Sequence, residues 1–340
     1  MEVSMIGLDI AKQSFQVHGV GADGSVLVRR QLRRSQVERY FAGLAPCMVG
    51  LEACASAHHW ARVIAGYGHE VRLVPTRTVK AYVRRGKNDA LDAAAICEAA
   101  GRPGVRLVAA KSMEQQSVLM LHKSRDLLIR QRTMLINALR AHLAEFGIVA
   151  AKGAIGAAAL LTLLRNGDPR LPALAQQAVL ALADQLESAR GQVLALDRAI
   201  LAWHRSDALS QRLAPIPGVG PLSATALAVI LRQADHFSSA KAFAAALGLT
   251  PKEHSTAGKT RLRSISKMGN GYLRRLLVLG ATSQLRRAPK ATTPAAAWTR
   301  ALLARRPARV AAVALANKTA RIAWALVANQ RSYDPSYRAC

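Results

Sequence analysis

Acidic residues are scarce in this chain. Among its 340 residues, 20 are Asp or Glu and 48 are Lys or Arg, which gives a formal net charge of +28. So large an excess of positive charge predicts a polyanionic partner, and nucleic acid is the leading candidate. The chain is 51% hydrophobic, which excludes general disorder, and its length allows two or more domains. Each acid that occupies a special position is therefore informative.

The imbalance is greatest near the C-terminus. No Asp or Glu occurs between His254 and Tyr333, whereas sixteen Lys and Arg do. Ion pairs cannot form within such a stretch, so we expect phosphates to neutralise it, with release of counterions and a steep dependence of binding on salt. The alternative is a solvated basic face.

Cysteine is also rare. Cys47, Cys54, Cys97 and Cys340 form no C-x-x-C pair and have no histidine at a spacing typical of zinc sites. This predicts free thiols in a reducing compartment. The N-terminal residues MEVSMIGLDIAK lack the basic region and long apolar run of a secretory signal, so we expect a cytoplasmic protein.

Long uninterrupted hydrophobic runs are missing as well. The most apolar segment is ARVAAVALANKTARIAWALV, residues 308–327, and Arg309, Lys318 and Arg321 interrupt it. These charges are too frequent for a membrane span and favour a packed helix.

The order of elements in the first third predicts an α/β domain. Hydrophobic runs and turn residues predict three consecutive strands, then helix, strand, helix, strand and helix, at residues 3–10, 14–20, 25–32, 35–44, 47–53, 57–68, 70–75 and 76–100. This β-β-β-α-β-α-β-α order is what a ribonuclease-H-like domain requires, with a mixed sheet flanked by helices.

The remainder of the chain reads as helical. Leu121, Leu128 and Leu135 recur every seven residues, which predicts a long amphipathic helix that either packs within the chain or forms a dimerising coiled coil. We favour a dimerisation or spacer arm. The expected domains are 1–110, 111–206 and 207–340.

The third predicted domain opens with PIPGVGPLSATALAVIL, which resembles a helix-hairpin-helix. Gly218 and Gly220 would expose backbone N–H groups at a helix N-terminus, where one phosphate can bind without sequence readout. A plain tight connection between two helices is the alternative.

Four carboxylates stand where a two-metal nuclease needs them. Asp9 and Glu52 each end an apolar strand, and Asp89 and Asp92 lie three residues apart on one helical face. Such oxygen ligands suit Mg²⁺ or Mn²⁺, and two such ions can clamp the attacking and leaving oxygens of a phosphodiester. Each acid alone could instead cap a helix or form a turn. The set of four favours a metal site.

A second group of residues lies in PKEHSTAGKTRLRSISKMGNGYLRRLLVLGA, residues 251–281. A serine hydroxyl in a flexible basic loop can attack a phosphodiester, and Ser255 is the first hydroxyl of STAGK. The basic residues that would hold nucleic acid are Lys259, Arg261, Arg263, Lys267, Arg274 and Arg275. From the residues alone, helix capping and non-covalent phosphate binding are the stronger reading, because His254 is the one base in evidence.

These motifs together resemble the one-ten/eleven-eleven group of bacterial insertion-sequence transposases, also called DEDD transposases. The segments that carry the resemblance, in the family's order and covering residues up to about 285, are IGLDIAK, GLEACASAHHWAR, KNDALDAAAI, IPGVGPLSA and GLTPKEHSTAGKTRLRSISKMGNGYLRRLL. AHHWAR and KSMEQQSVLMLH resemble the eleven-eleven branch in particular.

The resemblance implies a RuvC-like N-terminal domain, a helical linker that joins protomers and a mainly helical C-terminal transposase domain. Asp9, Glu52, Asp89 and Asp92 take the metal-ligand roles, with Mg²⁺ or Mn²⁺ as cofactor. Ser255 matches the serine that forms a phosphoserine link to DNA, and Thr256, Ser264 and Ser266 are other hydroxyls nearby. Ala257 stands where the family usually has a second glycine.

The implied partners are donor and target DNA, a structured guide RNA encoded in the element, and further copies of the chain in a dimer or tetramer. The expected setting is the nucleoid of a bacterium. Two alternatives remain at this point. One is a RuvC-like structure-selective nuclease that uses metal-activated water, and the other is a non-catalytic nucleic-acid-packaging protein.

Overall fold

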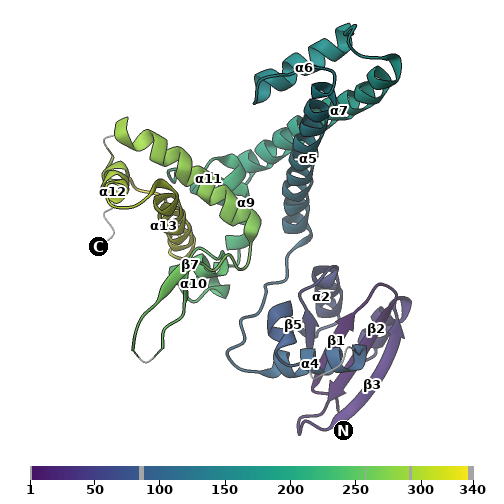
Figure 1. The fold of residues 1–340 in the computed structure, drawn as a ribbon. Helices are drawn as coiled ribbons and strands as arrows, with labels where there is room; N and C mark the ends of the chain where they lie inside the picture. Colours follow the sequence, from purple (N-terminus) through teal and green to yellow (C-terminus); the bar gives the residue numbers. More distant parts are fainter. Residues whose placement is uncertain (1, 84–87, 257, 291–292, 336–340) are drawn as a thin grey trace. The chain divides into compact units, whose positions relative to one another are not determined.

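The computed structural model describes residues 2–83, 88–256, 258–290 and 293–335 (Figure 1). The chain forms two compact units, residues 1–116 and 117–340. The expected further division of the second unit at residue 206 stays a prediction.

The first unit contains a five-stranded mixed sheet. Its strands are β1 (Met5–Ile10), β2 (Ser14–Val20), β3 (Val26–Arg33), β4 (Met48–Glu52) and β5 (Glu70–Val74), in the spatial order β3-β2-β1-β4-β5. The first three form an antiparallel meander, whereas β1, β4 and β5 run parallel. The predicted mixed sheet is confirmed. The carboxyl ends of β1, β3 and β4 consequently lie along one edge of the sheet.

The helices of this unit are the short turn at 34–36, α1 (Val37–Ala42), α2 (Ala57–Gly66), α3 (Thr76–Lys80) and α4 (Asp89–Gly101). The expectation of continuous helix over 76–100 is wrong, because residues 81–83 are not helical and a new helix begins at Asp89. Asn88 has an extended backbone, and its side chain accepts a 2.9 Å hydrogen bond from the N–H of Ala90. This N-cap starts α4 afresh.

Helix α4 packs directly on β1 and β4 because two glycines leave room for it. A Cβ atom on Gly7 would collide with the backbone of Ala93 and Cys97, and one on Gly50 would meet Ala100. Since alternate residues of a strand share a face, Asp9 lies on the same face as Gly7, and Glu52 on the same face as Gly50. Both acids therefore face the side of the sheet that α4 covers. The opposite face buries the apolar side chains of the meander against α1 and α2.

The second unit is mainly helical. Its helices are α5 (Met113–Ala144, which begins in the first unit), α6 (Ala154–Asn166), α7 (Ala173–Ser206), α8 (Ala208–Leu213), α9 (Pro221–Leu231), α10 (Ala240–Ala246), α11 (Gly271–Arg287), α12 (Pro294–Leu303) and α13 (Ala308–Ala328). A two-stranded hairpin, β6 (Pro251–Glu253) and β7 (Leu262–Ile265), stands between α10 and α11.

Helix α5 uses its hydrophobic residues in two ways. Leu135 packs with the buried Leu139 and Leu143 in a core shared with α6 and α7. A neighbouring row, Met120, Leu127 and Met134, is 65%, 48% and 68% exposed. Part of the predicted stripe is therefore intramolecular core, and part of it points to solvent.

Helix α13 is both long and apolar. By length and composition alone it could cross a membrane, and 39% of its most apolar window is buried inside the protein. Its buried residues pack in the same core as α10 and α11, which lie beside it in Figure 1. The Lys318 ammonium lies 4.3 Å from the centre of the Trp298 ring, a cation–π contact.

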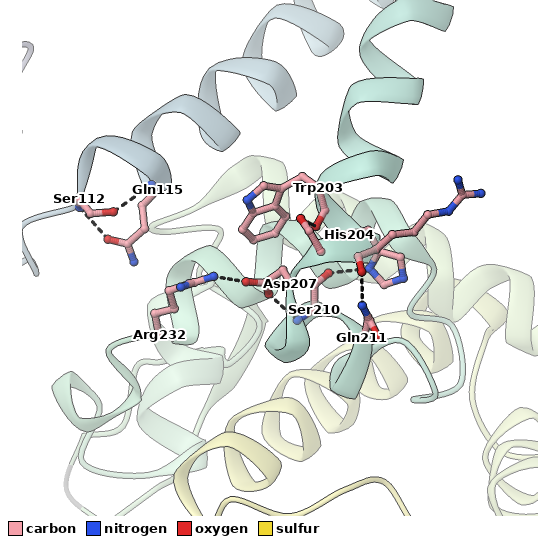
Figure 2. Close-up of polar contacts among 10 residues, drawn as sticks. Ser112, Gln115, Trp203, His204, Asp207, Ser210, Gln211 and Arg232 are labelled. Carbon is pink, nitrogen blue, oxygen red and sulfur yellow. Dashed lines mark hydrogen bonds and ion pairs between the residues drawn. The ribbon is translucent and has the colours of Figure 1, made fainter.

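Figure 2 shows how the end of α7 is joined to α8 and α9. The carboxylate of Asp207 has two partners. Its Oδ1 accepts a 2.7 Å hydrogen bond from the N–H of Ser210 and so caps α8. Its Oδ2 forms an ion pair with Arg232 at the end of α9. His204 Nδ1 and the Ser210 hydroxyl are 2.7 Å apart. Asp207 is 8% exposed, so both of its partners are needed to offset the loss of water.

A second buried polar network joins α5, α9 and α11. His122 is fully buried, its Nδ1 lies 2.9 Å from the Tyr272 hydroxyl, and its Nε2 lies 3.0 Å from the Thr225 hydroxyl. Burial, together with the charge of Arg125, lowers the pKa of His122 to about 4. The imidazole is thus neutral in the folded protein at any pH near 7.

We expect His122 to make the second unit sensitive to acid. Between pH 6.5 and 4 the unfolded chain binds a proton at this residue that the native state excludes, so the free energy of unfolding falls as the pH is lowered, by up to about 3 kcal/mol. His122→Gln should weaken this dependence, although it also costs stability at pH 7. Thermal unfolding of both proteins from pH 7.5 to 5 tests this. Parallel Tm curves would contradict it.

Candidate functional site

Three carboxylates of the first unit converge at the carboxyl end of β1. Oxygen atoms of Asp9, Asp89 and Asp92 all lie within 4.8 Å of one another. Asp9 comes from the strand, and the other two come from the first turn of α4. The convergence follows from the close packing of α4 on the sheet and from the i, i+3 spacing along the helix.

Glu52 lies near this group but is not part of the trio. It ends β4, the strand that pairs with β1, and its charge is one of those that act on Asp9. The pKa of Asp9 is raised to about 6, first by burial and then by the negative charges of Asp92, Asp89 and Glu52. The four acids predicted from the sequence therefore interact electrostatically, three of them at ligand distance.

The residues present fit a divalent cation. All donors are carboxylate oxygens, which Mg²⁺ and Mn²⁺ prefer. Like charges this close repel each other, so a cation would relieve a cost that the chain otherwise carries. Asp89 and Asp92 also lie in the first turn of α4, where the positive end of the helix dipole favours acidic groups.

Ser255 lies beyond β6, near the end of the β6–β7 hairpin. The sequence predicted a flexible loop here, and the structure shows an antiparallel pair in which Glu253 is opposite Leu262. The Ser255 hydroxyl donates a 2.7 Å hydrogen bond to Oε1 of Glu253. Both side chains are exposed, and Ala257 lies outside the described residues.

Glu253 is the polar residue that sequence reasoning missed at this site. Its position two residues before Ser255 is the available signal, because residues i and i+2 of an extended segment point to the same side. From the sequence, His254 is the nearby base. His254 stands between Glu253 and Ser255, so on an extended backbone its side chain points to the other side.

The six basic residues predicted to bind nucleic acid fall into two groups. Lys259, Arg261, Arg263 and Lys267 are exposed on and around the hairpin. Arg274 instead donates from Nη1 to the carbonyls of Leu247 and Met268, at 2.8 and 3.0 Å, and so holds the base of the hairpin against α10 and α11.

Arg275 belongs with Arg274 in the second group. It forms an ion pair with Asp126 of α5, and its guanidinium carbon lies 5.3 Å from the centre of the Tyr272 ring. Both arginines thus have partners inside the fold, whereas the hairpin cations remain accessible to a polyanion.

The glycines of the predicted helix-hairpin-helix have different surroundings. Gly218 has a φ of +83°, and its backbone packs so closely on Gly280 of α11 that neither residue could carry a Cβ atom. Packing alone therefore accounts for Gly218. Gly220 is exposed at the N-cap of α9, and its role in phosphate binding stays a prediction.

Removing one carboxylate should stabilise the protein when no metal is bound. In EDTA we expect Asp9→Asn to raise the free energy of unfolding by about 1 kcal/mol, after solvent screening of a half-buried group is allowed for. This corresponds to roughly 4 °C in the Tm of a unit of this size. Millimolar Mg²⁺ should stabilise the wild type and leave the variant unchanged.

The pH dependence of this effect has a definite sign. The pKa of Asp9 is about 6 in the folded protein, above its ordinary value of 3.8. Between these values the native state keeps a proton that the unfolded chain has released, so stability falls as the pH rises. The Tm difference between Asp9→Asn and the wild type should be near zero at pH 4 and complete above pH 6. Glu98→Gln, on α4 but outside the carboxylate trio, is the control. An equal Tm response of that variant would contradict the assignment to Asp9.

Two transposase family models match this chain. A family model described as transposase, the DEDD model of the IS110 group, matches residues 6–148, and the model of the IS116/IS110/IS902 transposase family matches residues 210–295. The first match contains all four carboxylates, and the second contains the glycine turn and the serine hairpin.

Curated relatives resemble the chain over nearly its full length. A probable family 20 transposase of Pseudomonas aeruginosa is 48% identical over 337 residues, which cover 98% of this chain and all of the relative. The transposase for insertion sequence element IS1328 of Yersinia enterocolitica is 37% identical, with 95% of this chain and 96% of the relative covered. The transposase for IS1111A of Coxiella burnetii is also 37% identical, with 98% and 92% covered. The chain therefore belongs to the IS110/IS116/IS902 family of insertion-sequence transposases.

Proposed function

We propose that this transposase cuts and joins DNA by phosphodiester transesterification, with Asp9, Glu52, Asp89 and Asp92 as ligands of Mg²⁺ or Mn²⁺ and Ser255 as the nucleophile. The convergence of three carboxylates on one point carries the proposal, because a chain so poor in acid otherwise has no reason to place them together. The cofactor would supply Lewis-acid stabilisation of the phosphate undergoing reaction.

The first unit is proposed to be RuvC-like. An antiparallel meander continued by parallel strands is the sheet of a ribonuclease-H-like domain, and here the acids stand at the ends of β1 and β4 and on α4. This arrangement supports the assignment because it places every acid at one end of the sheet.

The serine step is proposed as follows. The Ser255 oxygen forms a bond to phosphorus and gives its proton to solvent. The bond from phosphorus to the oxygen of the departing strand breaks, and that oxygen takes a proton from solvent. Glu253 accepts the hydroxyl hydrogen at 2.7 Å in the free protein and so orients the Ser255 oxygen. The exposed Lys259, Arg261 and Arg263 stabilise the negative charge that develops on the phosphate. In a composite site, the hairpin of one protomer would serve the carboxylates of another.

Guidance by an RNA transcribed from the element is proposed on the family resemblance. The acid-free segment between His254 and Tyr333 supports it, because only four of its sixteen positive charges lie on and around the hairpin and the others add to the basic character of the chain. Recognition of both RNA and DNA by one chain would need such an excess.

Ser255→Ala should abolish a covalent protein–DNA adduct. The protein is incubated with the element RNA, end-labelled donor DNA and Mg²⁺, denatured and separated by electrophoresis. We expect an adduct with the wild type and none with the variant, because the alanine lacks the attacking oxygen. DNA cleavage by the wild type without any adduct would instead indicate hydrolysis by a nuclease, with Ser255 only binding phosphate.

Matched variants separate the roles around the serine. Thr256→Ala, Ser264→Ala and Ser266→Ala test the other hydroxyls and should keep the adduct. Glu253→Gln keeps an oxygen that can accept from Ser255 and should keep most of the adduct, whereas Glu253→Ala should reduce its rate about tenfold, as expected for one orienting hydrogen bond. Loss of the adduct in Glu253→Gln would show that the carboxylate takes the proton.

A dimer formed through α5 is also proposed. The exposed side chains of Met120, Leu127 and Met134 follow a seven-residue spacing, the pattern by which two helices pack together. Beside Met134 an open groove of about 510 Å³ between α5 and α7, lined in part by Leu128, Leu135 and Ala189, offers space for side chains of a second copy.

Leu127→Lys combined with Met134→Lys should dissociate this dimer. Two charges in a coiled-coil seam oppose association, so light scattering should show the mass of a dimer for the wild type and of a monomer for the variant at micromolar concentration. Thr162→Lys with Asn166→Lys adds the same charge on the exposed surface of α6, away from the seam, and should remain dimeric. Equal masses for all three proteins would exclude α5 as the interface.

A further inference from the structure

A basic groove in the first unit lies outside the carboxylate site. Its volume is about 780 Å³, and three cations, Lys12, Arg33 and Arg34, line it with a single acid, Glu38. His59 and Trp60 form another part of its wall. The three cations are exposed and therefore available to a ligand. Their excess over the acid gives the groove a positive potential, which favours an anionic ligand.

The guanidinium of Arg34 is held in place at this groove. Its central carbon lies 5.6 Å from the centre of the Phe15 ring and 5.2 Å from that of Trp60, and Nη1 donates to the carbonyl of Lys12 at 3.3 Å. An arginine has five N–H donors, and this is its one side-chain hydrogen bond within the described part of the chain. The group is thus positioned in advance, with donors left for an oxyanion such as phosphate.

The indole of Trp60 adds a second unused donor. Trp60 is 3% exposed, and its Nε1 has no acceptor among the residues that the structure describes. Buried indole N–H groups usually have a partner. A ligand oxygen entering the groove would be one way to provide it after a small movement of the ring.

Topology places the groove on the same edge of the sheet as the carboxylates. Lys12 follows β1, Arg33 and Arg34 are at the end of β3, and His59 and Trp60 lie in the first turn of the helix that follows β4. Asp9 lies at the carboxyl end of β1, three residues before Lys12. The acids face α4, whereas Phe15 and Trp60 pack on the opposite face. The two sites therefore lie on opposite faces of the sheet and meet at the carboxyl ends of its strands.

The spacing along this edge is set by the sheet. Strands β1 and β3 are separated by β2, so their ends lie about 10 Å apart at about 4.8 Å per strand. Along the axis of a duplex each strand advances about 3.4 Å per nucleotide, so this distance corresponds to roughly three nucleotides of duplex.

We propose that this groove binds a backbone phosphate of the DNA strand being cut, two to four nucleotides from the phosphate at the carboxylate site, with Lys12, Arg33 and Arg34 as its contacts. This rests on the proposed function, because the strand must reach the carboxylates. The groove anchors the strand across the sheet edge. It makes no base contact, so it binds any sequence.

The test is a scan with single neutral methylphosphonates along the donor strand. The full-length protein with element RNA is titrated with each duplex in Ca²⁺, so that binding is measured without strand transfer. The position of the metal site on the DNA is mapped separately, by hydroxyl radicals from Fe²⁺ added in place of Mg²⁺. With the wild type, we expect a methylphosphonate two to four nucleotides from that position to weaken binding at least threefold.

The matched variants are Lys12→Glu with Arg33→Glu in the groove and Arg29→Glu with Arg30→Glu on β3 outside it. All four side chains are exposed, and both pairs change the charge equally. In the groove variant, the same methylphosphonate should not weaken binding further. The slope of log affinity against log salt concentration should also decrease in magnitude by one to two more than in the control variant.

The outcomes separate the two proposals. A uniform scan, or a groove variant that keeps the wild-type pattern, would overturn the groove as a phosphate site even if the protein cuts DNA in Mg²⁺. A groove variant that loses RNA binding while its DNA scan is unchanged would overturn it too. A phosphate-specific effect abolished only by the groove variant would support it even if no adduct forms, in which case the proposed chemistry alone fails.

Discussion

The close packing of α4 on the sheet is the constraint on which the proposed active site depends. Gly7 and Gly50 allow the helix backbone to approach β1 and β4 where any side chain would collide. The same approach brings the first turn of α4 to the end of β1, so Asp89 and Asp92 meet Asp9. A larger residue at either glycine would move the helix and separate the acids.

That arrangement works against the stability of the free protein. Burial and three neighbouring negative charges raise the pKa of Asp9 to about 6, so its ionisation near neutral pH carries a cost. The whole chain has 28 more positive than negative groups, yet these charges do not neutralise the site. A bound cation would neutralise the carboxylates, and nucleic acid would neutralise the basic surfaces. The charge distribution is thus consistent with a protein completed by metal and polyanion.

The second unit separates rigid from accessible parts. Buried networks around His122 and Asp207 fix the helices to one another, because each polar group is satisfied only in one arrangement. The hairpin that carries Ser255 extends from this framework, with Arg274 holding its base. Its exposed serine can therefore meet a DNA strand while its position is set by packed helices.

Much of this organisation could be predicted from the sequence. The alternation of strands and helices in the first third, the four acids at strand ends and on one helical face, and the seven-residue spacing in α5 all follow from periodicity, which is a local property of the chain. The tertiary structure decided what periodicity cannot. It placed the N-cap at Asn88, since a cap is effective only where the chain has turned, and it divided the apolar residues of α5 between core and solvent.

The tertiary structure also brought Glu253 to Ser255 through a hairpin, and Arg34 to Phe15 and Trp60 through the sheet. Spacing along the sequence specifies which side chains share a face. Which partner that face meets depends on contacts between segments far apart in the chain, and these exist only after folding.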